Sequence, residues 1–97
     1  MLDPIDGTAP FVAGIPVFGT LIGLARAGRP WLGVIDHPAS DDRWVGVSGE
    51  MAALNGAPVR TRPCADIASA LMTNSNPDFF SDADRARFDA LRARVTY

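Results

Sequence analysis

The sequence predicts an α+β fold, in which a meander of antiparallel strands comes first and one amphipathic helix comes last. Three observations support this fold class. Short apolar segments alternate with turn residues through the first two thirds of the chain. An Asn-Gly pair, Asn55 and Gly56, separates two extended pieces. The C-terminal segment changes to apolar residues at helical spacing. This order of elements fits an α+β fold better than an alternating parallel sheet.

The first two thirds of the chain contain the predicted strands. Residues 19–25 ("GTLIGLA") and 31–35 ("WLGVI") are expected to form a hairpin around the turn "RAGRP". After the loop "DHPASDD", residues 43–49 ("RWVGVSG") alternate large and small side chains, as a third strand would. The stretch "LNGAPVRT" adds two extended pieces around a type I′ turn. A sheet of sequential hairpins is therefore predicted.

The last third of the chain has a different sequence pattern. Residues 64–73 ("CADIASALMT") are interpreted as a helical turn that runs into a buried strand, and residues 74–80 ("NSNPDFF") as a loop. Residues 81–95 predict a helix capped by Ser81, with Asp84 in a capping-box position. One face of this helix is apolar and the other carries Asp-Arg pairs. The apolar residues are Phe88, Leu91 and Val95, and the expected pairs are Asp82–Arg85, Asp84–Arg87 and Asp89–Arg92.

The composition points to one small soluble domain. The 97 residues are 47% hydrophobic and 21% charged with a formal net charge of −2, so neither nucleic acid nor a membrane is an expected partner. Cys64 is the only cysteine, which excludes an intrachain disulfide and favours a cytoplasmic location. The acidic start, and the interruption of the apolar stretch 15–25 by proline and glycines, support neither a signal peptide nor a membrane span.

The opening "LDPIDGT" contains two carboxylates three residues apart, Asp3 and Asp6, with Pro4 between them. Because proline makes a continuous helix through the pair unfavourable, the chain is expected to turn there. Such a turn can gather both carboxylates and the Ile5 carbonyl around one volume, an all-oxygen environment of the kind that Mg²⁺ prefers.

The next two residues, Gly7 and Thr8, extend this pattern. If they open a helix, their backbone amides point toward an anion, which would place a phosphate beside a metal. Asp-Pro and Asp-Gly are also common turn dipeptides, however. Spacing alone leaves a simple turn and a ligand site as alternatives.

A longer pattern favours the ligand site. The string "LDPIDGTxxFVxGxPxFGTLIGL" resembles the metal-binding signature of the inositol monophosphatase family of Mg²⁺-dependent phosphatases. The segments "GRPWLGVIDHP", "RWVGV", "NGAPVRTRPCADIASALMTNSNPDFF" and "VTY" resemble the histidinol-phosphatase branch of that family. The resemblance implies part of an αβαβα sandwich and hydrolysis of L-histidinol phosphate in histidine biosynthesis. Inositol 1-phosphate, or a related sugar or nucleoside phosphate, is the alternative substrate, and a homodimer is the implied full-length form.

The resemblance also implies a role for each residue of the opening motif. Asp3 would bridge metal ions, Ile5 would contribute its main-chain carbonyl, and Asp6 would be a second carboxylate ligand that also lies at the substrate. The amides of Gly7 and Thr8 would hold the substrate phosphate. Asp3 and the Thr8 hydroxyl would act in catalysis, the hydroxyl by orienting the attacking water. The metals would lower the pKa of that water and neutralise phosphate charge, without a covalent intermediate.

Other parts of the family's site are not encoded in this sequence. A glutamate from a Gly-Glu-Glu type motif is expected upstream of the aspartate motif, and a Trp-Asp type motif is expected beyond Tyr97. Residues 1–97 are therefore interpreted as the central fragment of a single domain, nearly inactive and poorly soluble in isolation because the sheet would lack its covering helices. A non-catalytic remnant that serves as a structural or subunit-binding piece is the alternative of another class.

The remaining chemically suggestive residues are expected to be structural. His37 and Asp36 follow a strand and are interpreted as turn residues, and Cys64 as a small buried residue. Trp31 and Trp44 stand at the starts of neighbouring strands, where large aromatic side chains pair across a sheet, and a core or subunit contact is their expected role. Two arginines, Arg60 and Arg62, are placed on an exposed strand face, with a substrate or subunit contact as the alternative.

Overall fold

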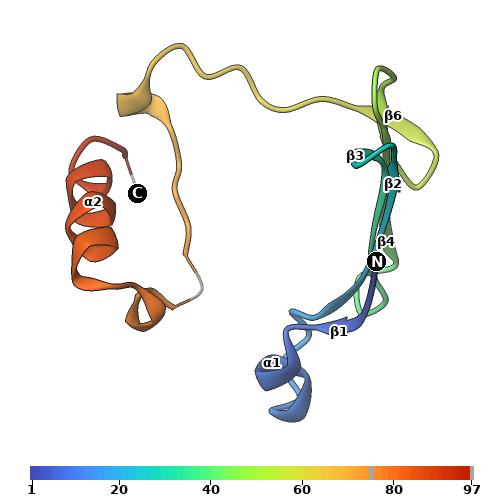
Figure 1. Ribbon diagram of the computed structural model, residues 1–97, viewed down its shortest axis with the longest axis horizontal. Helices are drawn as coiled ribbons and strands as arrows, with labels where there is room; N and C mark the ends of the chain where they lie inside the picture. Colours follow the sequence, from blue (N-terminus) through green and yellow to red (C-terminus); the bar gives the residue numbers. More distant parts are fainter. Residues whose placement is uncertain (75, 97) are drawn as a thin grey trace. The chain divides into compact units, whose positions relative to one another are not determined.

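The computed structural model describes residues 1–74 and 76–96 of the chain (Figure 1). These residues form two compact units, the first from Met1 to Thr61 and the second beginning at Arg62. No helix within the described ranges is long and apolar enough to cross a membrane. Each unit has its own set of elements, and the candidate site lies entirely in the first.

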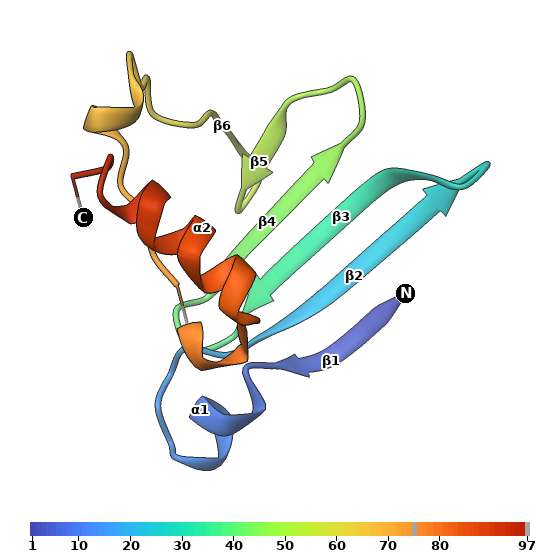
Figure 2. The same ribbon diagram turned by 60° about the vertical axis from the view of Figure 1, so that its left-hand side comes forward.

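The first unit is a six-stranded antiparallel sheet in which the strands follow one another in sequence order. Figure 2 shows strands β1 to β5 side by side. This arrangement confirms the predicted meander. The strands are β1 (Leu2–Asp6), β2 (Gly19–Arg26), β3 (Arg29–His37), β4 (Asp42–Val47), β5 (Ala52–Leu54) and β6 (Ala57–Val59), with one short helix, α1 (Thr8–Val12), between β1 and β2.

Two hairpins close with two-residue turns in the left-handed region, the geometry that matches the twist of antiparallel strands. Between β5 and β6, Asn55 has φ 49° and Gly56 has φ 83°, which confirms the predicted type I′ turn. Between β2 and β3, Ala27 and Gly28 have φ 50° and 73°. Strand β3 is longer than predicted, because it continues through His37 and shortens the expected loop "DHPASDD".

Strand β1 is the main departure from the prediction in this unit. Residues 2–6 do not form an isolated turn; they pair with β2 as an edge strand of the sheet. Pro4 is tolerated because an edge strand leaves one side of its backbone unpaired. The turn occurs instead at Gly7, directly after the strand.

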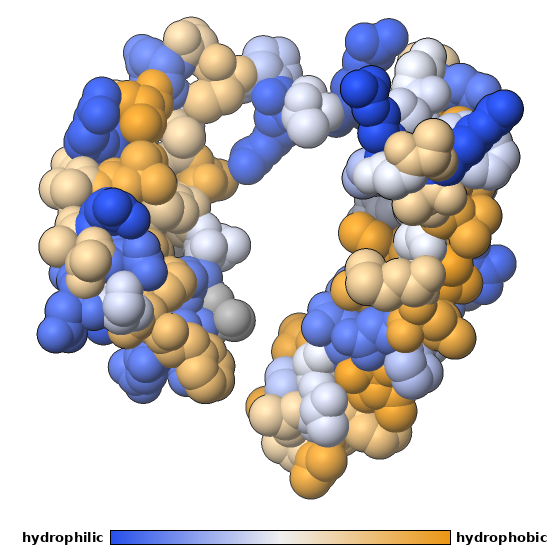
Figure 3. Space-filling view, in the orientation of Figure 1, coloured by the Kyte–Doolittle hydropathy of each residue, from blue (hydrophilic) through white to orange (hydrophobic). Residues whose placement is uncertain are grey.

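The sheet presents apolar side chains on both faces. Cross-strand partners share a face, so Leu21, Ile35 and Trp44 lie on one side, and the adjacent residues of the same strands lie on the other. Among the described residues no hydrophobic side chain is buried, and hydrophobic residues appear at the surface in Figure 3. Trp44 lies opposite Ile35, and Trp31 is 43% exposed, so Trp31 is not a core residue of this unit.

The second unit consists of two 3₁₀ turns and one α-helix: η1 (Ile67–Ser69), η2 (Pro77–Phe79) and α2 (Asp82–Arg92). The predicted helical turn is present as η1, capped by the Asp66 side chain. The buried strand expected to follow it is wrong. Leu71 is 54% exposed, and the described residues of this unit contain no strand with which the segment could pair. Ser75 of the predicted loop, and Tyr97 of "VTY", lie outside the described residues.

Helix α2 confirms the predicted amphipathic helix and its cap. The Ser81 hydroxyl oxygen accepts a hydrogen bond from the Asp84 amide at 3.2 Å, and the hydroxyl donates to the Asp84 carboxylate at 2.7 Å. Rings of Phe80 and Phe88 pack with centroids 5.3 Å apart. Among the ion pairs of the described residues, Asp84–Arg87 occurs as predicted at 3.1 Å, while Arg85 pairs with Asp89 at i+4 in place of the two other expected pairs.

Candidate metal and phosphate site

A β-bulge in β1 brings the two predicted carboxylate ligands to one side of the sheet. Asp3 lies opposite Leu21 and Asp6 lies opposite Gly19, so two residues of β1 stand against the single residue Thr20 of β2. Because residues 19 and 21 of a strand point to the same face, their partners Asp3 and Asp6 also share a face. A regular strand would have separated residues three apart onto opposite faces.

Side chains bond to the backbone groups of the two bulged residues, Pro4 and Ile5. The Ile5 amide donates to the Asp3 carboxylate at 3.2 Å. The Ile5 carbonyl accepts a hydrogen bond from the Thr8 hydroxyl at 3.2 Å, and the Pro4 carbonyl accepts one from the Thr20 hydroxyl at 2.9 Å. Proline has no amide hydrogen, so every polar backbone group of the bulge has a partner. Three of the predicted site residues are thereby connected to one another.

Gly7 makes the turn from β1 into α1 and is the N-cap of this helix. Its φ of 85° and ψ of 44° are left-handed, a conformation that glycine adopts without steric cost. A Cβ atom at this position would lie 3.0 Å from the Val17 carbonyl oxygen and 3.3 Å from the Phe18 Cα, so the residue is also packed closely against the approach to β2. The prediction that this glycine permits a close backbone approach is consistent with this geometry.

Helix α1 begins at Thr8, as expected if Gly7 and Thr8 open a helix. No side chain caps its first amides. Pro10 stands in the first turn, where an amide hydrogen would have no intrahelical partner in any case. The Phe11 ring packs edge-on against the Phe18 ring at 4.9 Å and ties the helix to the entrance of β2. The first amides of α1 therefore remain available for an anion.

The residues of the bulge fit a hard divalent cation in type but not in number. Two carboxylates and one carbonyl are the oxygen ligands that Mg²⁺ and similar ions bind. Asp3 uses one carboxylate oxygen for the Ile5 amide, which leaves the other oxygen free, and the Ile5 carbonyl keeps a second lone pair beside its bond to Thr8. The described residues contain no cluster of three or more acidic, histidine or cysteine side chains. Mg²⁺ coordination would need further oxygens from water or from other protein residues.

The other chemically suggestive residues do not join this site. The His37 ring packs edge-on against Trp44 at 5.7 Å, in agreement with a structural role. Cys64 is exposed, so the expectation that it is buried is wrong. Strand β6 ends at Val59, so Arg60 and Arg62 lie beyond the strand on which they were placed, and Arg60 contacts the Met51 sulfur at 3.6 Å.

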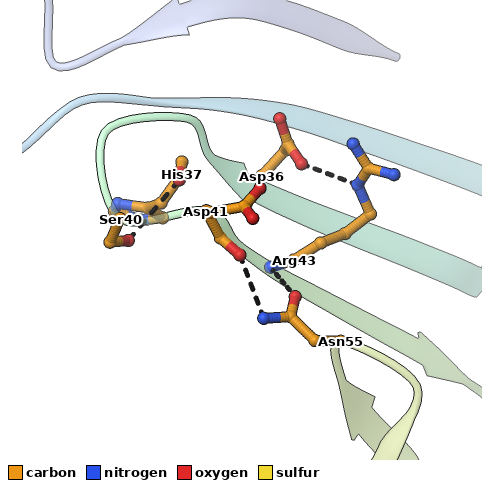
Figure 4. Close-up of polar contacts among 6 residues, drawn as sticks. All are labelled: Asp36, His37, Ser40, Asp41, Arg43 and Asn55. Carbon is orange, nitrogen blue, oxygen red and sulfur yellow. Dashed lines mark hydrogen bonds and ion pairs between the residues drawn. The ribbon is translucent and has the colours of Figure 1, made fainter.

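A second polar cluster lies at the turn end of the hairpin β3–β4 (Figure 4). Asn55 donates through its side-chain amide to the Asp41 carbonyl at 2.9 Å and accepts from the Arg43 amide at 2.8 Å. Arg43 forms an ion pair with Asp36 at 2.6 Å, which explains the structural role expected of Asp36. This cluster joins β4 to the β5–β6 turn.

Thr20 is the residue of the site that sequence reasoning missed. It belongs to "GTLIGLA", which predicts a strand and forms part of the family signature, but nothing in that stretch distinguishes Thr20 from other strand threonines. Its contact with Pro4 depends on the register between β1 and β2. The proline between two acids, in a segment followed by a strand, was the available signal for a bulged edge.

Comparisons with known proteins agree with the site motif. The sequence model of the inositol monophosphatase family matches residues 1–94. A chloroplastic bifunctional phosphatase of Arabidopsis thaliana is 42% identical over 95 residues, which cover 98% of this chain and 28% of the relative. A histidinol-phosphatase of Chlorobaculum parvum is 32% identical over 96 residues, which cover 93% of this chain and 37% of the relative. The chain thus spans between 28% and 37% of the length of these two relatives.

Solved structures share the fold. An inositol monophosphatase from Zymomonas mobilis superimposes with a TM-score of 0.91 and 41% identity, covering 97% of this chain and 37% of that one. An inositol monophosphatase from Anabaena superimposes with a TM-score of 0.81 and 28% identity, covering 97% of this chain and 38% of that one. These matches confirm the predicted α+β class as part of the inositol monophosphatase fold. With its family motif placed on a matching fold, the chain belongs to the inositol monophosphatase family.

Proposed function

We propose that this chain carries part of the active site of a metal-dependent phosphomonoesterase. The family consists of metal-dependent phosphatases that act on small phosphorylated molecules. The observation that supports the assignment within this chain is the bulge in β1, which places Asp3 and Asp6 on one face of the sheet. Directly after it come the uncapped first amides of α1. Carboxylates for a cation and amides for a phosphate are thus adjacent in the chain.

The proposed roles are those that the family resemblance implies, and this geometry supports them. Asp3, Asp6 and the Ile5 carbonyl hold the cation, and the backbone amides of Gly7 and Thr8 hold the substrate phosphate. The Thr8 hydroxyl orients the attacking water, and its bond to the Ile5 carbonyl fixes its position next to the cation ligands. The Asp3 carboxylate accepts a hydrogen bond from the Ile5 amide, and this bond orients the carboxylate.

The proposed metal is Mg²⁺, because all three protein ligands are oxygens. When bound, such an ion lowers the pKa of water and neutralises negative charge on the phosphoryl oxygens. The remaining ligands are proposed to come from water and from protein residues outside this chain, since the relatives are much longer than residues 1–97. The isolated chain is accordingly proposed to be nearly inactive.

The proposed substrate is L-histidinol phosphate. Proteins named histidinol-phosphatase are 32% identical over 96 residues in Chlorobaculum parvum and 44% identical over 59 residues in Mycobacterium tuberculosis. Inositol monophosphate is the second candidate, supported by the 41% identity to the Zymomonas mobilis inositol monophosphatase. For the full-length enzyme we propose a homodimer, on the basis of the family resemblance.

A segment exchange tests this proposal. Residues 1–95 replace the homologous segment of the Arabidopsis phosphatase, which matches 98% of this chain and supplies the rest of the domain. Mg²⁺-dependent phosphate release is then measured with L-histidinol phosphate and with inositol 1-phosphate. We expect an active hybrid, and a loss of at least about a hundredfold in the Asp3→Asn and Asp6→Asn hybrids.

The control is Asp41→Asn, which neutralises an exposed aspartate in a left-handed turn that asparagine also tolerates. An active hybrid in which Asp3→Asn and Asp6→Asn behave like this control would contradict the proposed ligand roles. An inactive but folded hybrid would favour the non-catalytic alternative. The ratio of the two phosphate-release rates decides between the two substrates.

A further inference from the structure

We propose that Thr20 is a positioning residue for the cation ligands, acting through the carbonyl of Pro4; this inference rests on the proposed function. Thr20 is the single residue of β2 that stands against the two bulged residues of β1. Its hydroxyl donates to the Pro4 carbonyl at 2.9 Å. The side chain of Thr20 therefore links strand β2 to the backbone of the bulge in β1.

The position of this bond explains its effect. Asp3 and Asp6 share a face only because β1 contains one residue more than β2 between their partners. Without the Thr20 bond, the Pro4 carbonyl would lose this side-chain partner, and proline has no amide hydrogen with which to form another bond. The bulge would then be free to shift, and the spacing between the two carboxylates would change with it.

The surroundings of Thr20 direct its hydroxyl toward Pro4. The cross-strand neighbour of Thr20 in β3 is Asp36, whose carboxylate is a strong competing acceptor. That carboxylate is engaged by the Arg43 guanidinium at 2.6 Å, and Arg43 is opposite Asp36 in β4. The ion pair weakens this competition, because it engages one of the two oxygens of the Asp36 carboxylate.

The bulge uses two threonines, and they have different tasks. Thr8 is at the substrate end, and its hydroxyl holds the Ile5 carbonyl, a proposed cation ligand. Thr20 holds the carbonyl of the preceding residue, which ligates nothing in the proposed site. A substitution at Thr20 should therefore change the affinity for the cation without removing any ligand.

The test measures binding of Mn²⁺ alone to the hybrid enzyme described above, in which the Arabidopsis segments supply the rest of the domain, by electron paramagnetic resonance, with the Pro4 carbonyl ¹³C shift as a second readout. Thr20→Val keeps the shape of the side chain and removes the hydroxyl. We expect it to shift the Pro4 signal and to weaken Mn²⁺ binding by about threefold to tenfold, the effect of one lost hydrogen bond. Thr20→Ser should restore both, and Thr61→Val, at an exposed residue beyond the strands, should change neither.

The outcomes separate this inference from the proposed function. If Asp3→Asn abolishes Mn²⁺ binding while Thr20→Val binds Mn²⁺ like the wild type, the proposed site stands and the role of Thr20 is overturned. An unchanged Pro4 signal in Thr20→Val overturns the hydrogen bond itself. If the hybrid with Asp3 and the hybrid with Asp3→Asn bind Mn²⁺ equally, the role of Asp3 in the metal site is overturned, and the role of Thr20 with it.

Discussion

Replacing Gly7 with alanine should destabilise the first unit more than the same substitution at another left-handed glycine. Gly7 has φ 85° and Gly14 has φ 71°, so an alanine at either position is forced into the left-handed region. The two positions differ in their surroundings. A Cβ at Gly7 would lie 3.0 Å from the Val17 carbonyl oxygen, whereas a Cβ at Gly14 has no atom within 4 Å.

The expected magnitudes follow from this difference. Gly14→Ala carries the left-handed penalty alone, about 1–2 kcal/mol in the free energy of unfolding. Gly7→Ala adds the cost of pushing Cβ against backbone atoms, which cannot rotate away as a flexible side chain would. Overpacking of this kind costs about 1–3 kcal/mol. The free energy of unfolding of Gly7→Ala should therefore lie below that of Gly14→Ala by the overpacking cost of about 1–3 kcal/mol.

Urea unfolding followed by tryptophan fluorescence measures this difference, because Trp31 and Trp44 both lie in the sheet. The comparison uses the shift in midpoint at constant slope, which keeps the two variants on one scale. Equal midpoints for Gly7→Ala and Gly14→Ala would refute the close approach of Gly7 to the backbone of Val17 and Phe18. A Gly7→Ala variant as stable as the wild type would refute the left-handed turn as well.

Three further predictions concern local contacts. Asn55→Ala removes two hydrogen bonds and a residue suited to φ 49°, so it should lower the free energy of unfolding by about 2–3 kcal/mol in urea titrations. Ser81→Ala removes the cap of α2, and circular dichroism should show a helix weakened by about 1 kcal/mol. The Ser69 hydroxyl and amide lower the pKa of Asp66 from its ordinary value of 3.8. Ser69→Ala should raise that pKa in a carboxyl ¹³C titration. Because the pKa is lowered in the folded state, the bond stabilises η1 above pH 3.8 and is lost as the pH falls through the lowered pKa.

Turns and caps were predictable because their chemistry is local. Asn55 and Gly56 supply the two left-handed residues of a type I′ turn, and Ser81 supplies a helix cap, whatever surrounds them. The strand at residues 2–6 was not predictable in the same way. Its proline and two acids are typical of a turn, and only pairing with β2, whose partner residues lie 13 to 20 positions later in the sequence, makes it a strand.

The prediction of a buried strand in the segment 64–73 was wrong for a related reason. Its apolar residues predict a buried strand. An apolar stretch becomes a strand only where a neighbouring strand can pair with its backbone. The side chain of Asp66 instead closes a 3₁₀ turn with Ser69 at 2.9 and 2.8 Å. This local bond competes with extended structure, as aspartate and serine side chains often do.

The site motif combines both kinds of information. Ligand types could be identified from the residues alone, whereas the relative position of the ligands depends on register. Asp3 and Asp6 are three positions apart in the sequence. In a regular strand this spacing puts the two side chains on opposite faces, and Pro4 makes a helix through the pair unfavourable. One extra residue in β1 converts that spacing into a shared face, and side chains from β1, α1 and β2 satisfy the backbone groups that the extra residue leaves unpaired. These bonds lie at exposed positions, where each contributes about 0.5–1.5 kcal/mol, so the loss of any one of them should loosen the bulge. The position of the carboxylates therefore depends on all three side chains together, and the family motif is a structural unit that extends from Asp3 into β2.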